Sequence, residues 1–422
     1  MLNILYIGPN YSEWGQEHCP CSLAAAKWSR GFLTALGKIA RVTALTHIYQ
    51  FPWPKGRHLW IGRDERMLPE GCNCETVSYP ALKWIRELWF GWAYASKAKK
   101  IITTKKIDVV LIYNCYIPWE VKVLKAIRKA HPKVKIVPII LDGDDPRKDN
   151  WGWMKLAAKY SDAFVALSWW VHQNIPANTG LPSYHFDGGA DGWRGLDVLK
   201  FRSLESNSPN IQTSKHPNFT LVHTGALDQW RGLDFIIEVV KKLAAKRKDV
   251  KFVFTGKSCA KVLEAVFKDN PQVELPGFVS EEEMGRICNN ADVLLNVRDP
   301  NHPDNILNYP SKLPHYLSFG RPVVSTRLAS LSPDYDEVVN FSRVERVERV
   351  DDSHKEHREH KEVDEYVEKV EEVLAWSDER SVEEYKKIKA WFEHRKSWDV
   401  MVKGLVEWLE SFVHELHEFN EF

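Results

Sequence analysis

The sequence predicts an α/β protein built from two Rossmann-like domains. Near-continuous apolar runs such as Ile107–Tyr113 and Val134–Leu141 are typical of parallel strands buried on both faces. Helical segments separate these runs, and the alternation favours right-handed β-α-β units. Because 422 residues exceed what one ordinary core holds, two domains of comparable size are expected. The polar stretch 203–216 is typical of a linker, so the domains are predicted at 1–202 and 217–384.

Composition narrows the function classes. The chain has 58 basic and 57 acidic residues and a formal net charge of +1, which disfavours a generic nucleic-acid binder. Its seven cysteines, an odd number, favour reduced thiols in the cytoplasm. The start MLNILYIG is a poor signal peptide, and no apolar run approaches the roughly 20 residues that cross a bilayer. We therefore expect a cytoplasmic protein that is soluble or peripheral at the inner face of a membrane.

The first domain opens with a strand, Leu2–Ile7, followed by a long loop, Gly8–Cys21, and a helix that Ser22 caps and that reaches about Leu36. In doubly wound sheets, ligands bind where strands end. Gly15 and His18 are therefore candidates by position, and a surface loop with a solvated His18 is the alternative. Further strands and helices are predicted at Val42–Thr46, Trp119–Ala130, Trp151–Tyr160 and Ala163–Ser168.

The segment Leu82–Lys106 is rich in both aromatic and basic residues. It is predicted as a helix with Trp84, Leu88 and Trp92 along one stripe and lysines gathered toward its end. Such a segment can lie on an anionic membrane surface. Ordinary core packing with a solvated lysine face is the alternative.

A cluster of carboxylates follows the strand Val134–Leu141. Asp142-Gly143-Asp144-Asp145 forms a turn at the strand's carboxyl end, where chemistry is commonly placed. Asp142 and Asp144 are candidates for catalysis or acceptor binding, and plain turn chemistry or Mg²⁺ binding are the alternatives. Asn114, at the end of the preceding strand, is a candidate for acceptor binding.

In the second domain, strands are predicted at Phe219–Gly225 and Lys251–Gly256, with a helix at Leu233–Lys246 and a capping box at Ser280 and Glu283. The stretch from Asp304 to Thr326 reads as loop, helix, turn and strand, with Gly320 as a C-cap. Free N–H groups near Ser311–Leu313, together with the Lys312 ammonium, would cradle an anion such as a diphosphate. An amphipathic helix with a solvated Lys312 is the alternative.

Three motifs in this domain resemble the donor-binding half of GT-B glycosyltransferases of the family 4 type. They are HTGALDQWRG at His223–Gly232, the portion Pro276–Val297, and PSKLPHYLSFGRPVVST at Pro310–Thr326. The resemblance implies two domains facing a cleft, a last helix that crosses back to the first domain, and no metal or other cofactor. The C-terminal helices, about 385–422, would then complete the N-terminal domain.

The resemblance also implies a donor site. Arg231 falls where the family places a lysine that meets the diphosphate. Ala226 stands where family members often have a second basic residue, and Lys257 or Lys312 would supply that contact instead. The family's paired glutamates fall on Leu307 and His315, with Asn305 and Asn308 as polar substitutes nearby. The full set of donor-binding candidates is Gly225, Arg231, Lys257, Asn308, Ser311, Lys312, Leu313 and His315.

The resemblance implies a hexosyltransferase that moves a sugar from a UDP- or GDP-sugar to a saccharide or lipid-linked acceptor, without a metal and with retention. The departures at Ala226 and Leu307 leave the donor and the stereochemical outcome open. A GT-B nucleotide-sugar epimerase and a non-catalytic nucleotide-sugar-binding module are the alternatives. The stretch from Phe341 to Glu372, dense in charge, is expected to be a solvated loop or helix.

Overall fold

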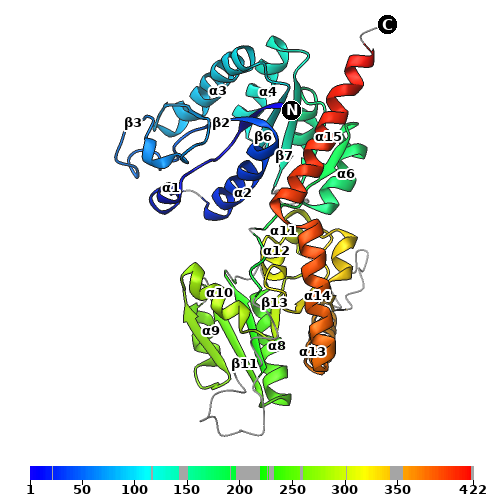
Figure 1. The fold of residues 1–422 in the computed structure, drawn as a ribbon. Coiled ribbons are helices and arrows are strands. Elements are labelled where there is room, and N and C mark those ends of the chain that lie inside the picture. Colours follow the sequence, from blue (N-terminus) through cyan, green and yellow to red (C-terminus); the bar gives the residue numbers. More distant parts are fainter. Residues whose placement is uncertain are drawn as a thin grey trace. The chain divides into compact units, whose positions relative to one another are not determined.

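The computed structural model describes residues 1–20, 22–115, 117–141, 151–190, 192–195, 219–225, 227, 232–256, 260–300, 302–342 and 355–419. The chain forms two compact units (Figure 1). Unit 1 comprises Met1–Gly189, Leu307–Tyr309 and Ser397–Phe422, and unit 2 comprises Ala190–Ile306 and Pro310–Lys396.

Unit 1 is built on a seven-stranded parallel sheet with the order β4-β2-β1-β6-β7-β8-β9. Its strands are β1 (Asn3–Ile7), β2 (Arg41–Thr46), β4 (Cys74–Thr76), β6 (Val109–Tyr113), β7 (Lys135–Ile140), β8 (Phe164–Ala166) and β9 (Ser183–His185). Ile4 of β1 lies between Val42 and Val109 in register. The apolar runs of the sequence thus form the centre of a doubly covered sheet, as predicted.

Helices cover this sheet, with α2 beside α15 and α3 beside α4. The helices of unit 1 are α1 (Glu13–His18), α2 (Leu23–Ile39), the 3-10 helix η1 (Glu65–Met67), α3 (Lys83–Lys105), α4 (Pro118–Ala130), α5 (Trp151–Ala158), α6 (Trp169–Thr179) and α15 (Trp398–Phe419). A short antiparallel pair, β3 (Trp60–Ile61) with β5 (Tyr79–Pro80), lies outside the main sheet.

The stretch Gly8–Cys21 is not the continuous loop that we predicted. Helix α1 lies within it, and the Ser12 side chain caps this helix by accepting a hydrogen bond from the Gly15 N–H. Gly15 lets α1 approach η1, because a Cβ at Gly15 would stand 2.8 Å from the Met67 carbonyl oxygen. Helix α1 is stabilised by its packing on η1. It is too short for an apolar periodicity in the sequence to predict it.

Unit 2 contains a six-stranded parallel sheet with the order β12-β11-β10-β13-β14-β15. Its strands are β10 (Phe219–Thr224), β11 (Val250–Thr255), β12 (Val273–Gly277), β13 (Val293–Asn296), β14 (Val323–Ser325) and β15 (Val339–Phe341). Its helices are α8 (Leu233–Lys246), α9 (Ala260–Phe267), α10 (Glu281–Asn289), α11 (Pro303–Leu307), α12 (Lys312–Leu317), η3 (Pro333–Glu337), α13 (Lys355–Leu374) and α14 (Asp378–Arg395). Two parallel α/β sheets confirm the predicted fold class.

Helix α13 corrects the expectation of a merely solvated segment at Phe341–Glu372. Its outer positions are charged, whereas a buried stripe joins the core of unit 2. Tyr366 in this stripe donates a hydrogen bond from its hydroxyl to the Val324 carbonyl of the central sheet, at 2.8 Å. The members of the stripe are Val363, Tyr366, Val367, Val370, Val373 and Leu374.

The chain returns to unit 1 at Ser397, later than the predicted residue 385. Helix α14 stays in unit 2, where Tyr385 packs on Trp193 and Trp391 on Tyr335. Helix α15 begins with Trp398, which lies 5.9 Å from Trp28 by ring centroids. The predicted linker 203–216 lies outside the described residues.

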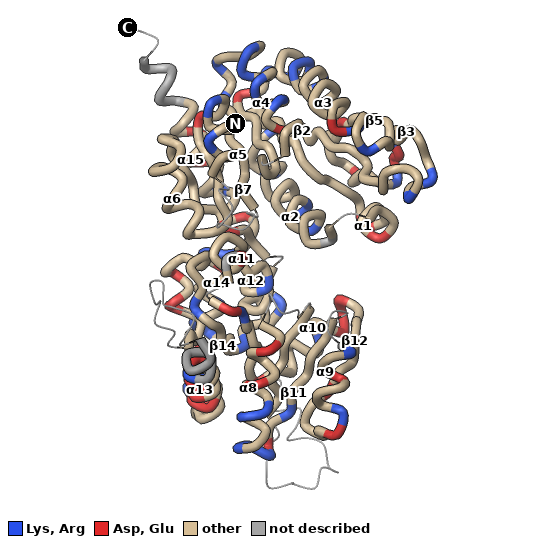
Figure 2. Tube along the Cα trace, turned by 180° about the vertical axis from the view of Figure 1, so that it is seen from behind, with Lys and Arg blue, Asp and Glu red and all other residues tan. Residues whose placement is uncertain are grey.

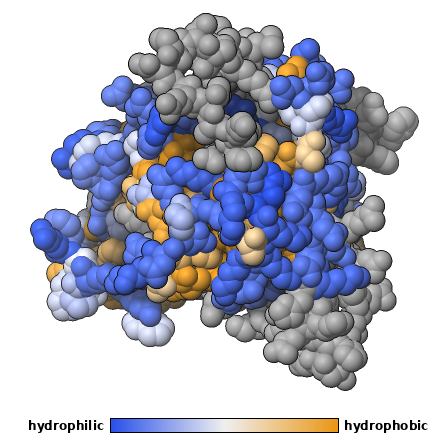
Figure 3. Space-filling view, turned by 90° about the horizontal axis from the view of Figure 1, so that it is seen from below, coloured by the Kyte–Doolittle hydropathy of each residue, from blue (hydrophilic) through white to orange (hydrophobic). Residues whose placement is uncertain are grey.

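Two chemical properties of the described chain bear on the expectations above. Cys19, Cys72, Cys74, Cys115 and Cys288 are free thiols. No helix among the described residues is long and apolar enough to cross a bilayer. Viewed from below, the surface is largely hydrophilic, with apolar areas between the polar residues (Figure 3).

Candidate functional site

Three glycines end three neighbouring strands of unit 2. Gly225, Gly256 and Gly277 follow or close β10, β11 and β12, and all have positive φ, at 84°, 134° and 73°. The Gly225 N–H donates to the Thr255 carbonyl, and the Gly256 N–H donates to the Gly277 carbonyl, both at 2.8 Å. A Cβ at Gly256 would stand 2.6 Å from the Gly225 oxygen. Only glycine fits this row, which leaves a small hollow at the strand ends.

The Lys312 side chain lies over the first of these glycines. A Cβ at Gly225 would stand 3.1 Å from Lys312 Cε and 3.4 Å from its Nζ. The same Nζ lies 3.1 Å from His223 Nε2. Strand β10 and helix α12 therefore bring a cation to the carboxyl end of the sheet, which is the edge where α/β proteins bind ligands.

The surroundings of His223 define its protonation. Its Nδ1 lies 2.9 Å from the Leu295 carbonyl oxygen, which can only accept, so Nδ1 carries the proton. Nε2 then holds a lone pair that accepts a hydrogen bond from the Lys312 ammonium. Burial, reinforced by the Lys312 charge, holds the pKa of His223 well below its usual value. A neutral histidine thus anchors the lysine.

Tyr316 fixes α12 to the same strand. Its hydroxyl accepts a hydrogen bond from the Thr224 N–H at 2.8 Å and lies 3.2 Å from Thr224 Oγ1. Complete burial raises the pKa of Tyr316 far above its usual value, so the phenol stays protonated. Lys312 and Tyr316 are one helical turn apart, so this buried bond and the His223 contact set the position of the lysine together.

The backbone at the start of α12 differs from our expectation of free N–H donors. The Leu313 N–H donates to the Pro310 carbonyl at 2.9 Å, and the Leu313 side chain is fully buried. It therefore offers neither a free donor nor a side chain to a ligand here. Ser311 is exposed and makes no side-chain cap. The Lys312 side chain, not the helix end, is the anion-binding feature that remains.

The other donor candidates have varied surroundings. His315 is partly buried, and its ring meets Phe319 edge-on at 5.0 Å. Asn305, a substitute for the family's glutamate, donates to the Asp299 carbonyl at 2.7 Å and accepts from Arg298 at 3.3 Å, so it holds its own loop together. Leu307 is buried and Asn308, in unit 1, is half-buried. Arg231, Lys257 and Ala226 lie outside the described residues.

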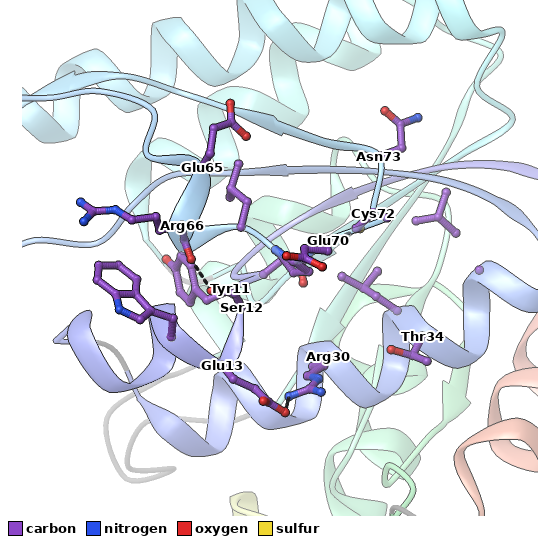
Figure 4. A pocket seen from close by; sticks show the side chains of 18 of the residues that line it. Tyr11, Ser12, Glu13, Arg30, Thr34, Glu65, Arg66, Glu70, Cys72 and Asn73 are labelled. Atoms are coloured by element: carbon purple, nitrogen blue, oxygen red, sulfur yellow. Dashed lines mark hydrogen bonds and ion pairs between the residues drawn. The ribbon is translucent and has the colours of Figure 1, made fainter.

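Unit 1 contains an open pocket of about 1040 Å³ (Figure 4). Its walls come from the chain after β1, from α2 and the start of β2, and from the segment Glu65–Asn73. Ser12 bridges two of these walls, because its hydroxyl donates to the Arg66 carbonyl. The side chains labelled around the pocket are Tyr11, Ser12, Glu13, Arg30, Thr34, Glu65, Arg66, Glu70, Cys72 and Asn73.

Two arginines of this pocket are paired within the protein. Arg30 meets Glu13 at 2.6 Å, and Arg66 forms two hydrogen bonds to Asp64 at 3.1 and 2.9 Å. The Arg66 guanidinium also lies 4.7 Å from the Trp14 ring centre. Paired charges beside an aromatic face can bind neutral polar ligands by hydrogen bonds and stacking.

The predicted acceptor candidates lie near this pocket or at the sheet edge. Gly15 is buried against Met67, so its neighbours Ser12 and Trp14 line the pocket in its place. His18 is exposed, and its ring stacks on Trp14 at 4.1 Å. Asn114 adopts a left-handed φ of 54° and accepts the Leu141 N–H at 2.9 Å. Asn114 therefore holds the chain at Leu141, directly after strand β7.

Asp142 and Asp144 lie outside the described residues. Among the residues that are described, no three His, Cys, Asp or Glu side chains are grouped so as to hold a metal. Sequence reasoning missed His223 and Tyr316, although the motif HTGALDQWRG begins at His223. A histidine near a strand end, with a lysine and tyrosine at spacing four in the motif Lys-Leu-Pro-His-Tyr, was the available signal.

Residues 218–342 match the family model of the glycosyl transferases group 1. This match covers β10 to β15 and therefore the Gly225, His223 and Lys312 cluster. No curated protein matches the sequence.

Several solved structures share the fold across nearly the whole chain. Sucrose-phosphate synthase from Thermosynechococcus elongatus has a TM-score of 0.63 at 11% identity, over 98% of this chain and 100% of its own. Anabaena HepE, in complex with UDP and glucose, has a TM-score of 0.57 at 14% identity, over 97% of this chain and 100% of its own. The catalytic domain of starch synthase IV from Arabidopsis thaliana, bound to ADP and acarbose, has a TM-score of 0.57 at 11% identity, over 98% of this chain and 99% of its own. Residues 218–342 thus match the glycosyl transferases group 1, and the whole chain has the GT-B fold that these solved structures share.

Proposed function

We propose that this protein transfers a hexosyl group from a nucleoside diphosphate sugar to a saccharide or lipid-linked acceptor. The observation that carries the proposal is the Lys312 ammonium, anchored by neutral His223 over Gly225. An anchored cation over a glycine suits a diphosphate, because no side chain at Gly225 stands between the phosphate oxygens and the ammonium.

The chemistry assigned to this cluster is electrostatic. Departure of the sugar leaves negative charge on the diphosphate, and a cation fixed before the reaction stabilises that charge without reorganisation. Neutral His223 is the better anchor, since a second positive charge would repel the ammonium. Arg231 and Lys257 remain proposed contributors on the grounds of the family resemblance. The same resemblance is the ground for proposing a metal-independent, retaining reaction.

The donor is proposed to be a UDP- or GDP-sugar. HepE was solved with UDP and starch synthase IV with ADP, so the nucleotide varies among proteins of this fold. Leu307 is apolar and buried where the resembled family has a glutamate. We therefore expect the sugar ring to be bound mainly by hydrogen bonds from neutral groups, with His315 and Asn308 as candidates.

The unit 1 pocket is the proposed acceptor site. Its hydroxyl, amide and carboxylate groups suit sugar hydroxyls. Asp142, Asp144 and His18 remain the candidates for assisting the acceptor hydroxyl. Their roles rest on position in the sequence.

Calorimetry with UDP, GDP, ADP and the matching uridine, guanosine and adenosine tests the donor site. One diphosphate should bind at least tenfold more tightly than its nucleoside, a difference of about 1.4 kcal/mol. No preference of any diphosphate over its nucleoside would contradict the proposal.

Incubation of the preferred nucleotide sugar with candidate acceptors, with and without EDTA, tests the reaction. A transferase should form a glycosylated acceptor in both conditions. Conversion to an isomeric nucleotide sugar would identify an epimerase instead. Tight binding without any turnover would identify a non-catalytic module.

A further inference from the structure

Helix α3 turns an apolar stripe away from the core. Its inner face packs Phe90, Tyr94 and Ala98, all of them buried. On the opposite side, three large apolar residues follow one another at intervals of one helical turn. They are Trp84, Leu88 and Trp92, and their exposed fractions are 82%, 67% and 64%. Large exposed side chains repeated at this spacing form a continuous stripe, unlike the single exposed apolar residues that any protein surface carries.

A second segment extends the stripe. Trp53 donates its N–H to the Ala81 carbonyl, and the Leu59 carbonyl accepts from the Ala81 N–H, so residues 53–60 lie against the start of α3. Trp60 of β3 meets Trp89 at 5.4 Å, and Trp89 meets Trp92 at 5.1 Å. We call the exposed set the tryptophan patch: Trp53, Leu59, Trp60, Trp84, Ile85, Leu88 and Trp92, each at least 49% exposed.

Positive charge surrounds the tryptophan patch. The ranges 51–65 and 83–92 contain five basic residues, of which Arg63 pairs with Glu65 and Arg86 with Glu87. Lys55, Arg57 and Lys83 form no ion pair among the described residues (Figure 2 colours lysine and arginine blue). Lys83 Nζ lies 5.8 Å from the Trp84 ring centre. The lysines near the end of α3 are instead used within the protein, because Lys97 pairs with Glu75 at 3.2 Å and Lys105 donates to Asn73 at 2.9 Å.

We propose that the tryptophan patch docks this protein on an anionic lipid bilayer. Tryptophan favours the interface of a bilayer, where its ring contacts acyl chains and its N–H meets polar headgroups. Neighbouring lysine and arginine bind anionic headgroups. Three basic side chains, Lys55, Arg57 and Lys83, lie outside the described ion pairs beside this apolar stripe, in a chain of net charge +1. This arrangement favours an anionic surface over a neutral protein partner. The tryptophan patch belongs to unit 1 and the Lys312 cluster to unit 2, so this proposal stands independently of the proposed reaction.

Flotation with vesicles of phosphatidylcholine, with and without phosphatidylglycerol, tests the docking. The wild-type chain should bind the anionic vesicles, and the bound fraction should fall as salt is raised. The triple variant Trp84→Ser, Leu88→Ser, Trp92→Ser should bind at least tenfold more weakly. All three positions are exposed, so its melting temperature should stay close to that of the wild type.

Two matched controls separate docking from general stickiness and general charge. Phe278→Ser removes a side chain in unit 2 that is 68% exposed and should leave vesicle binding unchanged. Lys55→Glu with Lys83→Glu should weaken binding severalfold, whereas Lys261→Glu with Lys268→Glu on exposed positions of unit 2 changes net charge equally and should not.

Light scattering of the lipid-free protein tests the alternative that a second copy of the chain binds the tryptophan patch. A wild-type oligomer that the serine triple variant dissolves, together with absent vesicle binding, would overturn the proposal and identify a contact between copies of the chain. Vesicle binding that the triple variant retains would overturn it as well. Loss of binding only in the variants of the tryptophan patch supports it.

Discussion

The candidate sites of the two units are lined by different kinds of groups. In unit 2, glycines line a small hollow at the strand ends, and one anchored cation lies over the first of them. In unit 1, a pocket of about 1040 Å³ is lined by side chains, among them the paired Arg30 and Glu13 and the paired Arg66. The first surface is fixed by the fold and leaves little room for substitution, whereas the second consists of side chains that can change without altering the sheet.

This difference teaches where specificity resides. In the proposed reaction, a diphosphate is common to many donors, and we propose that the fixed lysine beside Gly225 recognises that common part. An acceptor varies between proteins of one fold, and a pocket made of side chains allows that variation. The comparison predicts that unit 2 variants change diphosphate binding and that unit 1 pocket variants change acceptor choice.

The largest effect should come from a substitution that destabilises unit 1 and leaves unit 2 intact. Trp398 packs on a surface made flat by glycines, since a Cβ at Gly31 would stand 2.2 Å from its Nε1 and one at Gly189 2.8 Å from its Cα. Trp398→Ala should lower the stability of unit 1 by about 2–4 kcal/mol. Hydrogen exchange measured by mass spectrometry should show faster exchange in β1, α2 and β6 and unchanged exchange in β10 to β14.

Gly31→Ala is the matched test at the same contact. It should destabilise unit 1 alone but cost much less in the Trp398→Ala background, where the clashing ring is absent. Equal costs of Gly31→Ala in both backgrounds would contradict the proposed packing. Accelerated exchange in both units would show that they are not stabilised separately.

The next effect concerns the fixed cation of unit 2. Lys312→Ala should weaken nucleoside diphosphate binding by about 1.5–3 kcal/mol, the usual range for a lost charge-assisted bond. Nucleoside affinity should hardly change, and calorimetry measures both. Arg66→Ala, in the unit 1 pocket, is the control and should leave diphosphate affinity unchanged. If Lys312→Ala lowers only the melting temperature, the lysine is structural.

The sequence predicted most of the fold because buried strands and long amphipathic helices have a simple period. The helix Leu233–Lys246 was predicted with the bounds that the structure has. Helix α13 was not recognised as a core helix, since frequent charged residues obscure the stripe of Val363, Tyr366, Val367 and Val370. Helix α1 depends on its contact with η1, and such a tertiary contact has no local signature.

The candidate site was predicted less completely than the fold. Gly225 and Lys312 followed from the motifs, and the structure brings them together. His223 was quoted within a motif but given no role, because no sequence pattern shows which way a ring nitrogen points. The Leu313 N–H was expected to be free, and only the observed turn at Pro310 shows that it is already bonded.

Each unit also buries a histidine in its neutral form, and pH distinguishes them. In unit 1, burial and then the Arg86 charge lower the pKa of His47 to about 3. Below about pH 6.5 the unfolded chain binds a proton that folded His47 does not, so the free energy of unfolding should fall with decreasing pH by about 1.4 kcal/mol per unit. The loss should continue until about pH 3.

His47→Gln should reduce the pH dependence of the free energy of unfolding of unit 1 by about 1.4 kcal/mol per pH unit, since glutamine does not titrate. Urea unfolding between about pH 7 and 5, followed by exchange in β2 and α3, measures the change. His58→Gln, at an exposed position, is the control. An unchanged slope in His47→Gln would show that His47 is not neutral in the folded protein.

The smallest expected effect tests the anchor of Lys312. In His223→Asn, the shorter amide can still donate to the Leu295 carbonyl but no longer reaches Lys312. In His223→Gln, the side-chain oxygen reaches the place of Nε2 and can accept from the ammonium. Asparagine should therefore weaken diphosphate binding by about 1 kcal/mol, and glutamine should recover most of it.

Both variants lose the ring that packs 6.3 Å from Phe254. Asparagine keeps the contact with the Leu295 carbonyl and glutamine keeps the contact with Lys312, so only the diphosphate affinity relative to the nucleoside reports on the position of the lysine. Calorimetry with the preferred nucleoside diphosphate, and with its nucleoside as the reference, measures the difference. Equal diphosphate affinities in the two variants would mean that Lys312 takes its position from α12 and Tyr316 alone, and that unit 2 fixes its cation through the helix without the histidine.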